Sequence, residues 1–193
     1  MTILGLPDVR SVLEGRAPLE LPEHEKWAAV AVLLREGTSG PEVLFIRRAE
    51  HPTDPWSGHM AFPGGRQESG DASLLQTAMR ETREEVGLDL SRQAEHIGQL
   101  DDLQAIARGK PQETVIRPFV FEVHRQSPIR VQEREVAEAL WAPLLPLYRG
   151  EADTVRPYQW QGTQIDFPAY DIGGRLVWGL TYQMLRSFFR ILG

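Results

Sequence analysis

The residues whose types and spacing suggest chemistry lie between Gly64 and Leu88, where two glycines precede a segment rich in acids. Three carboxylates, those of Glu81, Glu84 and Glu85, fall within five positions. Residues three and four apart are neighbours on an α-helix, so a helix would place Glu81 beside both other acids. The stretch therefore predicts a concentration of negative charge on one side of a helix.

That negative charge needs compensation, because a helix C-terminus is itself partly negative and like-charged neighbours cost about 0.2–0.5 kcal/mol each. Arg80 and Arg83 supply part of it. A hard divalent cation fits better, since Mg²⁺ typically joins one or two carboxylates to substrate phosphates. Gly64 and Gly65 let the backbone approach such a ligand without a Cβ clash. The pattern indicates metal-assisted phosphate chemistry, and the alternative is a solvated helix face with ordinary ion pairs.

The helix that carries these acids is predicted from its apolar spacing and its end signals. Asp71 is placed to cap the first turn, and Gly87 is placed to end the helix. The positions that recur at helical spacing are Leu74, Leu75, Ala78, Met79, Thr82 and Val86. One face of the helix is thus expected to pack against the protein while the other carries the charge.

The segment RETREEVGL, which begins at Arg80, resembles the second half of the Nudix box, and Gly65 stands where the box begins. The first half differs, because Asp71 takes the place of the usual glutamate and one extra residue precedes Arg80. The half of the motif that supplies the metal ligands of the family is intact.

Segments outside the box resemble one branch of this family, the coenzyme A pyrophosphatases. The similar segments are Arg48-Ala49, residues 58–65 and residues 177–181. Residues 51–56 depart from that branch, because Thr53 or Asp54 stands where the branch has arginine.

The resemblance implies an α/β fold, an α/β/α sandwich with a mixed β-sheet between helices. It implies hydrolysis of a nucleoside diphosphate linked to a group X, with Mg²⁺ or Mn²⁺ held by Glu81, Glu84 and Glu85. Arg80 would orient Glu84 or Glu81. The first expected substrate is coenzyme A or a derivative, and the alternative is ADP-ribose or a nucleotide sugar. An alternative of another class is a nucleotide-binding regulator without turnover.

The candidate substrate contacts are two arginines and the two glycines. They are Arg47, Arg48, Gly64 and Gly65. Guanidinium groups bind phosphate through paired hydrogen bonds, and the alternative for both arginines is plain solvation at the surface. His59 is interpreted as a loop histidine satisfied by backbone rather than as a ligand contact.

An acid outside the box often serves Nudix enzymes as a further metal ligand or base. The candidates are Glu133, Glu135, Asp101 and Glu113, and the sequence does not rank them. For each, a solvated surface position is the alternative.

Composition limits the other classes of function. The chain has 193 residues, of which 41% are hydrophobic and 25% charged, with no cysteine and a net charge of −6. The negative charge argues against a nucleic acid polymer as partner, while a small nucleotide remains suitable. No apolar run of about 18 residues is present, so we expect no membrane association and a cytoplasmic location. A homodimer would be usual for the family, and no local feature specifies one.

The chain is expected to form a single domain over residues 1–193, with residues 1–26 as a lead-in segment and the core beginning near Trp27. A polar loop is predicted over residues 101–113. The other expected elements are a helix at 8–14, strands at 27–34, 43–46, 96–100 and 115–123, a late strand and helix near 139–144, a hairpin within 155–172 and a final helix from about 177. The expected core face of the final helix comprises Leu180, Met184, Phe188 and Ile191.

Overall fold

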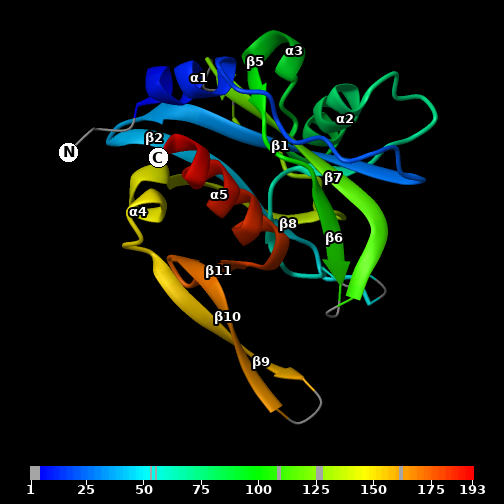
Figure 1. The fold of residues 1–193 in the computed structure, drawn as a ribbon, viewed down its shortest axis with the longest axis vertical. Helices are drawn as coiled ribbons and strands as arrows, with labels where there is room; N and C mark the ends of the chain where they lie inside the picture. Colours follow the sequence, from blue (N-terminus) through cyan, green and yellow to red (C-terminus); the bar gives the residue numbers. More distant parts are fainter. Residues whose placement is uncertain (1–4, 53, 55, 108–109, 125–127, 161–162) are drawn as a thin grey trace.

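A mixed sheet with two long central strands organises the protein, as the computed structural model in Figure 1 shows. The structure describes residues 5–52, 54, 56–107, 110–124, 128–160 and 163–193. Within these ranges the sheet has eight strands. β1 (Lys26–Gly37) and β7 (Lys110–Val123) pair in parallel, while the other strand pairs described are antiparallel. The remaining strands of this sheet are β2 (Gly40–Arg48), β3 (Met60–Ala61), β4 (Gly64–Arg66), β5 (Ala94–Gln99), β6 (Leu103–Ala107) and β8 (Val136–Pro143).

Both faces of this sheet are covered, as the burial of β1 demonstrates. Ala29, Ala31 and Leu33 belong to one hydrophobic cluster, while Val32 and Leu34 belong to a second. Successive side chains of a strand point to opposite faces, so a strand that is buried on both faces has an almost continuous apolar sequence. The helices are α1 (Leu6–Glu14), α2 (Leu74–Val86), α3 (Leu90–Gln93), α4 (Leu144–Tyr148) and α5 (Gly179–Leu192). The first cluster includes residues of α2 and α3 and the second includes residues of α1, α4 and α5, which confirms the predicted sandwich.

The lead-in segment contributes to the core. Leu6, Val9 and Leu13 of α1 are buried in the same cluster as residues of α5. The short predicted helix is therefore present, but the expectation that the core begins near Trp27 is wrong. Leucine and valine at helical spacing were the sequence signal for this contact.

A second sheet of three strands lies beside the first, formed by β9 (Asp153–Trp160), β10 (Thr163–Ile172) and β11 (Arg175–Trp178). β9 and β10 extend from the main body as a long ribbon, drawn in orange and yellow in Figure 1. The predicted hairpin is confirmed, although Gly162 lies outside the described residues. The final helix begins two residues later than predicted, because Val177 and Trp178 pair with β10.

Residues 101–113 were predicted to form a polar loop, but most of this segment belongs to the strands β6 and β7. β6 pairs with the first part of β7, with Leu103 opposite Ile116 and Ala107 opposite Lys110. Residues 108–109, between these two strands in the sequence, lie outside the described residues. Backbone hydrogen bonds, which depend little on side-chain type, stabilise this ladder, and so its polar sequence did not reveal it. In the part of the chain that the structure describes, no helix is long and apolar enough to span a membrane.

Candidate active site

A cleft of about 620 Å³ lies where β4, the end of α2 and the beginning of α5 meet. Its charged and aromatic lining residues include Arg48, His59, Glu81, Glu85, Glu135 and Trp178. Two acids of the predicted box, Glu81 and Glu85, thus reach one cavity together with residues from distant parts of the chain.

The two glycines of β4 place the backbone of that strand against β1 and against α2. Gly64 and Gly65 pair with Val30 and Ala29 of β1. A Cβ on Gly64 would lie 2.3 Å from the backbone oxygen of Ala29, so only glycine permits this approach. The backbone N–H of Gly64 donates a hydrogen bond of 2.9 Å to the carboxylate of Glu85. The strand therefore fixes the position of an acid on the helix.

Gly65 has a different neighbour. A Cβ at this position would lie 2.4 Å from Oε1 of Glu81, a side-chain atom. Glu81 thus occupies space that any other residue at position 65 would fill. Both glycines thus lie against acids of the box, and their contact with a substrate stays a prediction.

The cap of α2 differs from the prediction. Ser73 is the N-cap residue, and its side chain accepts a hydrogen bond from the backbone N–H of Gln76. Asp71, which was expected to cap the helix, instead accepts hydrogen bonds from the Thr77 hydroxyl and from Arg80, each at 3.0 Å. Gly87 ends the helix in the left-handed conformation, as predicted.

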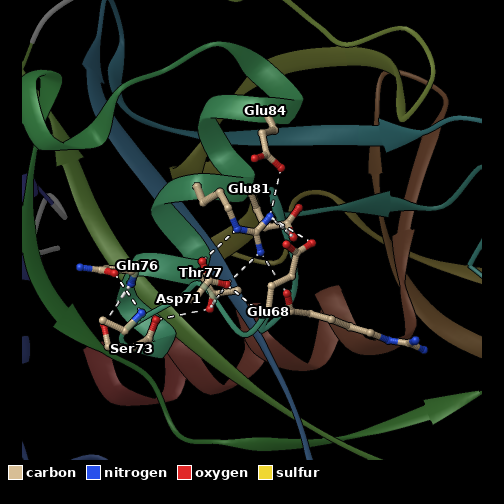
Figure 2. A network of polar contacts seen from close by, with 10 residues as sticks. Glu68, Asp71, Ser73, Gln76, Thr77, Glu81 and Glu84 are labelled. Atoms are coloured by element: carbon tan, nitrogen blue, oxygen red, sulfur yellow. Dashed lines mark hydrogen bonds and ion pairs between the residues drawn. The ribbon is translucent and has the colours of Figure 1, made fainter.

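Arg80 connects the beginning of the helix to its acidic end, because it contacts Asp71, Glu81 and Glu84, which are labelled in Figure 2. Its Nη1 lies 2.9 Å from Glu81 Oε1 and 3.0 Å from Glu84 Oε2. Its Nε and Nη2 donate to the two oxygens of Asp71, and Nη2 also donates to the backbone oxygen of Arg66. Asp71 and Arg80 each stabilise the charge of the other, so the pKa of Asp71 falls well below its ordinary value. The network limits the positions that Glu81 can adopt.

Glu85 is the most buried acid of the box, since only 3% of the residue is exposed. Burial raises its pKa to about 8, while the hydrogen bond from Gly64 opposes that shift. The negative charges of Glu81 and Glu135 raise this pKa further. Burial also raises the pKa of Glu81, against the effect of Arg80. The cleft therefore contains acidic groups whose charged forms lack full compensation.

The acidic groups of the cleft are of the type that binds a hard divalent cation. Glu81, Glu85 and Glu135 are oxygen donors that line one cleft, and a cation there would stabilise their charged forms. As the side chains lie, however, no three acidic or histidine side chains of the described residues are close enough together to hold a metal ion. Glu81 contacts Arg80, and the side chain of Glu84 contacts Arg80 and is 47% exposed. Metal binding would thus require a rearrangement of side chains within the cleft.

Of the four acids outside the box, only Glu135 lines the cleft among the described residues. The loop before it is attached to the end of α2, where Gln132 N–H donates to the backbone oxygen of Glu85 at 2.9 Å. Glu133 is exposed and is absent from the cleft lining. Asp101 pairs with Arg16 and Glu113 pairs with Lys26. The sequence offered no signal for this ranking, since it follows from the attachment of the loop to α2.

The two candidate arginines have different surroundings. Arg48 lines the cleft and donates two hydrogen bonds to Asp54, of 2.9 and 2.7 Å. Asp54 is one of the residues at which the chain departs from the coenzyme A branch, and Thr53 lies outside the described residues. Arg47 does not line the cleft and lies 3.6 Å from Glu138. The geometry therefore favours Arg48 over Arg47 as a contact for substrate.

Two residues that the sequence did not favour as ligand contacts line the cleft. His59 packs against Trp178 with ring centroids 4.7 Å apart and the rings tilted by 55°, and burial and Arg156 lower its pKa to about 4. Leu180 is only partly buried and lines the cleft, while Met184 and Phe188 are buried in the core as expected, with Met184 also reaching the cleft. The start of α5 therefore forms a wall of the cleft.

Comparison with known proteins gives consistent matches. A family model described as NUDIX domain matches residues 25–161. An uncharacterised protein of Schizosaccharomyces pombe is 44% identical over 119 residues, which cover 61% of this chain and 36% of that protein. The mitochondrial coenzyme A diphosphatase NUDT8 of Homo sapiens is 31% identical over 175 residues, which cover 89% of this chain and 71% of that protein. The crystal structure of a MutT/nudix family protein from Enterococcus faecalis matches 99% of this chain and 76% of that one, with a TM-score of 0.55 and 18% identity.

Proposed function

Because this chain belongs to the Nudix family of pyrophosphohydrolases, we propose that it hydrolyses the diphosphate bond of coenzyme A or a coenzyme A derivative, with Mg²⁺ or Mn²⁺. The family acts on derivatives of nucleoside diphosphates and generally uses divalent metal ions. The observation that carries the proposal is the meeting of Glu81, Glu85 and Glu135 in one cleft beside the glycines of β4.

Each residue has a role that follows from its surroundings. Glu81 and Glu85 would hold the metal ion, which would supply charge neutralisation for the diphosphate and activation of water. Glu84, held on Arg80 outside the cleft, joins them only after its side chain turns inward. Gly64 positions Glu85 through its N–H group, and Arg80 holds Glu81 at the cleft until a metal ion competes for that carboxylate.

The remaining polar groups of the cleft act on the substrate and on the attacking water. Arg48 contacts a phosphate of the substrate. Its guanidinium group then either keeps one hydrogen bond to Asp54 or gives up both. Glu135 is exposed at the edge of the same cleft and accepts the proton of the attacking water.

The apolar part of the cleft supports a coenzyme A compound over a sugar derivative. Val30, Phe62, Ile116, Leu180 and Met184 line it alongside the acids. A pantetheine chain can bury methyl and methylene groups against such a wall, whereas the hydroxyls of a sugar would lose hydrogen bonds with water there. The name of the human relative agrees with this substrate.

A substrate panel tests the proposal. The purified protein is incubated with Mg²⁺ or Mn²⁺ and, separately, with coenzyme A, ADP-ribose, NADH, a dinucleoside polyphosphate or a nucleotide sugar, and the products are identified by mass spectrometry. We expect 4′-phosphopantetheine and adenosine 3′,5′-bisphosphate from coenzyme A, and no product with a chelator. Preferred cleavage of ADP-ribose or a nucleotide sugar would overturn the substrate assignment and keep the chemistry. Binding without any product would favour a nucleotide-binding regulator.

A homodimer and a cytoplasmic location stay predictions. The human relative is named as mitochondrial, so fractionation of cells is the direct measurement of location.

A further inference from the structure

Arg156 of β9 carries a positive charge that no carboxylate among the described residues balances. Its guanidinium carbon lies 3.7 Å from the centroid of the Trp178 ring. Its Nη1 atom is buried and has no hydrogen-bond partner in the structure. A buried N–H group without an acceptor is costly, and a guanidinium group more so because of its charge. The position of Arg156 therefore favours an acceptor that the chain itself does not provide.

The other arginines nearby are compensated by carboxylates. Arg47 and Arg175 both contact Glu138, and Arg48 contacts Asp54. Burial lowers the pKa of Arg156, and the one group of the described residues that opposes this shift is Tyr158, not a carboxylate. The residues outside the described ranges include no aspartate or glutamate, so none of them can provide a carboxylate side chain. Arg156 thus differs from its neighbours in lacking an anion.

Arg156 lies next to the cleft, over the ring of Trp178, which lines the cleft. It lines a hollow of about 520 Å³ together with Arg47 and Arg175. This hollow and the cleft share His59, Met60 and Trp178 in their linings, so the two lie next to each other. His59 is uncharged near neutral pH, because burial and the charge of Arg156 lower its pKa to about 4. An anionic group in the hollow would therefore interact with the positive charge of Arg156 and not with a charge on His59.

We propose that Arg156, held on Trp178 beside the cleft, binds a phosphomonoester of the substrate that lies outside the diphosphate being hydrolysed. The proposal rests on the proposed function, in which the diphosphate lies beside the acids of α2. A guanidinium group offers paired N–H donors that match a terminal phosphate, and a phosphomonoester has a full set of free oxygens. Nucleotides with an additional phosphate on ribose are the substrate class that fits this site. Coenzyme A is such a compound, and its 3′-dephospho form lacks only that group.

Binding without metal and without turnover tests this assignment. Calorimetry measures the affinity of adenosine 3′,5′-bisphosphate and of AMP, which differ only in the additional phosphate. We expect the bisphosphate to bind wild-type protein at least about tenfold more tightly. In Arg156→Met, which keeps an apolar chain over Trp178, this preference should fall below about twofold. Arg156→Lys keeps the charge without the paired donors and should give an intermediate preference.

The chain offers a matched control in Arg35. Its guanidinium carbon lies 4.2 Å from the centroid of Trp141, but it is paired with Glu42 and lines neither the cleft nor the hollow. Arg35→Met should keep the wild-type preference for the bisphosphate. In hydrolysis, Arg156→Met should raise KM for coenzyme A and leave its kcat and the kinetics of 3′-dephospho-coenzyme A nearly unchanged.

The proposal is overturned if wild-type protein binds the two nucleotides equally, or if folded Arg156→Met keeps the full preference. If the substrate panel yields no hydrolysis of coenzyme A while the preference depends on Arg156, the proposed function fails and the phosphomonoester site stands. If coenzyme A is hydrolysed and no preference is found, the proposed function stands and the site fails.

Discussion

Replacing the two adjacent glycines of β4 by alanine, one at a time, should affect turnover in one variant and stability in the other. In Gly65→Ala the new methyl carbon would lie 2.4 Å from Glu81 Oε1, whereas ordinary contacts of this kind begin at 3.4 Å. The side chain of Glu81 must therefore move by about 1 Å. Misplacement by about 1 Å at a reacting centre costs on the order of a hundredfold in rate. We expect kcat to fall by about that factor with little change in melting temperature, because only a side chain has to move.

Gly64→Ala, in contrast, is expected to lower the stability of the protein. Its methyl carbon would lie 2.3 Å from the backbone oxygen of Ala29 and 2.6 Å from the Cα atom of Val30. Backbone cannot turn away as a side chain does, so β4 and β1 must separate, at a cost of about 1–3 kcal/mol or more. The two variants and the wild type are compared by initial rates on the substrate that the panel identifies and by thermal melting followed by circular dichroism. A folded Gly65→Ala protein with wild-type kcat, or a Gly64→Ala protein with wild-type stability, would refute the reasoning.

Three further changes test the site and the core. Glu85→Gln should lower kcat at least about a hundredfold without loss of the fold, since it removes a charged ligand but keeps an acceptor for Gly64; near-normal turnover with Mg²⁺ would contradict the ligand role. Asp71→Asn should lower the free energy of unfolding at pH 7 by about 1–3 kcal/mol, because Arg80 loses a charged acceptor. The pKa of Asp71 is depressed in the folded protein, so its contribution is complete above about pH 4 and is lost as pH falls through the folded-state pKa. The difference between variant and wild type in urea unfolding should shrink as the pH is lowered below about 4, and a difference independent of pH would exclude the ion pair as its cause. Met184→Ala should cost about 2–5 kcal/mol in urea unfolding, since Met184 is 3% exposed in the core, and an unchanged unfolding curve would contradict that placement.

Local signals were sufficient to predict much of α2 and the central strands. The apolar spacing of the helix and Gly87 at its end act within a few residues, and the structure follows both. Asp71 and Ser73 are both good cap residues, so local sequence alone did not distinguish them. Arg80 makes the difference, because it lies nine positions after Asp71 in the chain and donates hydrogen bonds to both oxygens of its carboxylate.

Features that depend on distant contacts were not available from the sequence. Glu135 enters the cleft because its loop is hydrogen-bonded to the end of α2, and spacing within the loop does not encode this. The buried state of Glu85 depends on β4, some 20 residues earlier in the chain. Arg156 carried no sequence signal, because its isolation from carboxylates is a property of the folded chain. Charge and exposure at the site therefore required the structure.

The parallel pairing of β1 with β7 has a consequence for the order in which the protein assembles. Lys26 pairs with Thr114 and Leu34 with Glu122, so paired residues are 88 positions apart in the chain. Contacts between such distant residues form slowly, because the loop between them must first be closed at a cost in entropy. That loop contains the two glycines and all of α2. We expect the hairpin of β1 and β2 to form early in refolding, while the active site becomes competent only when the central pair closes.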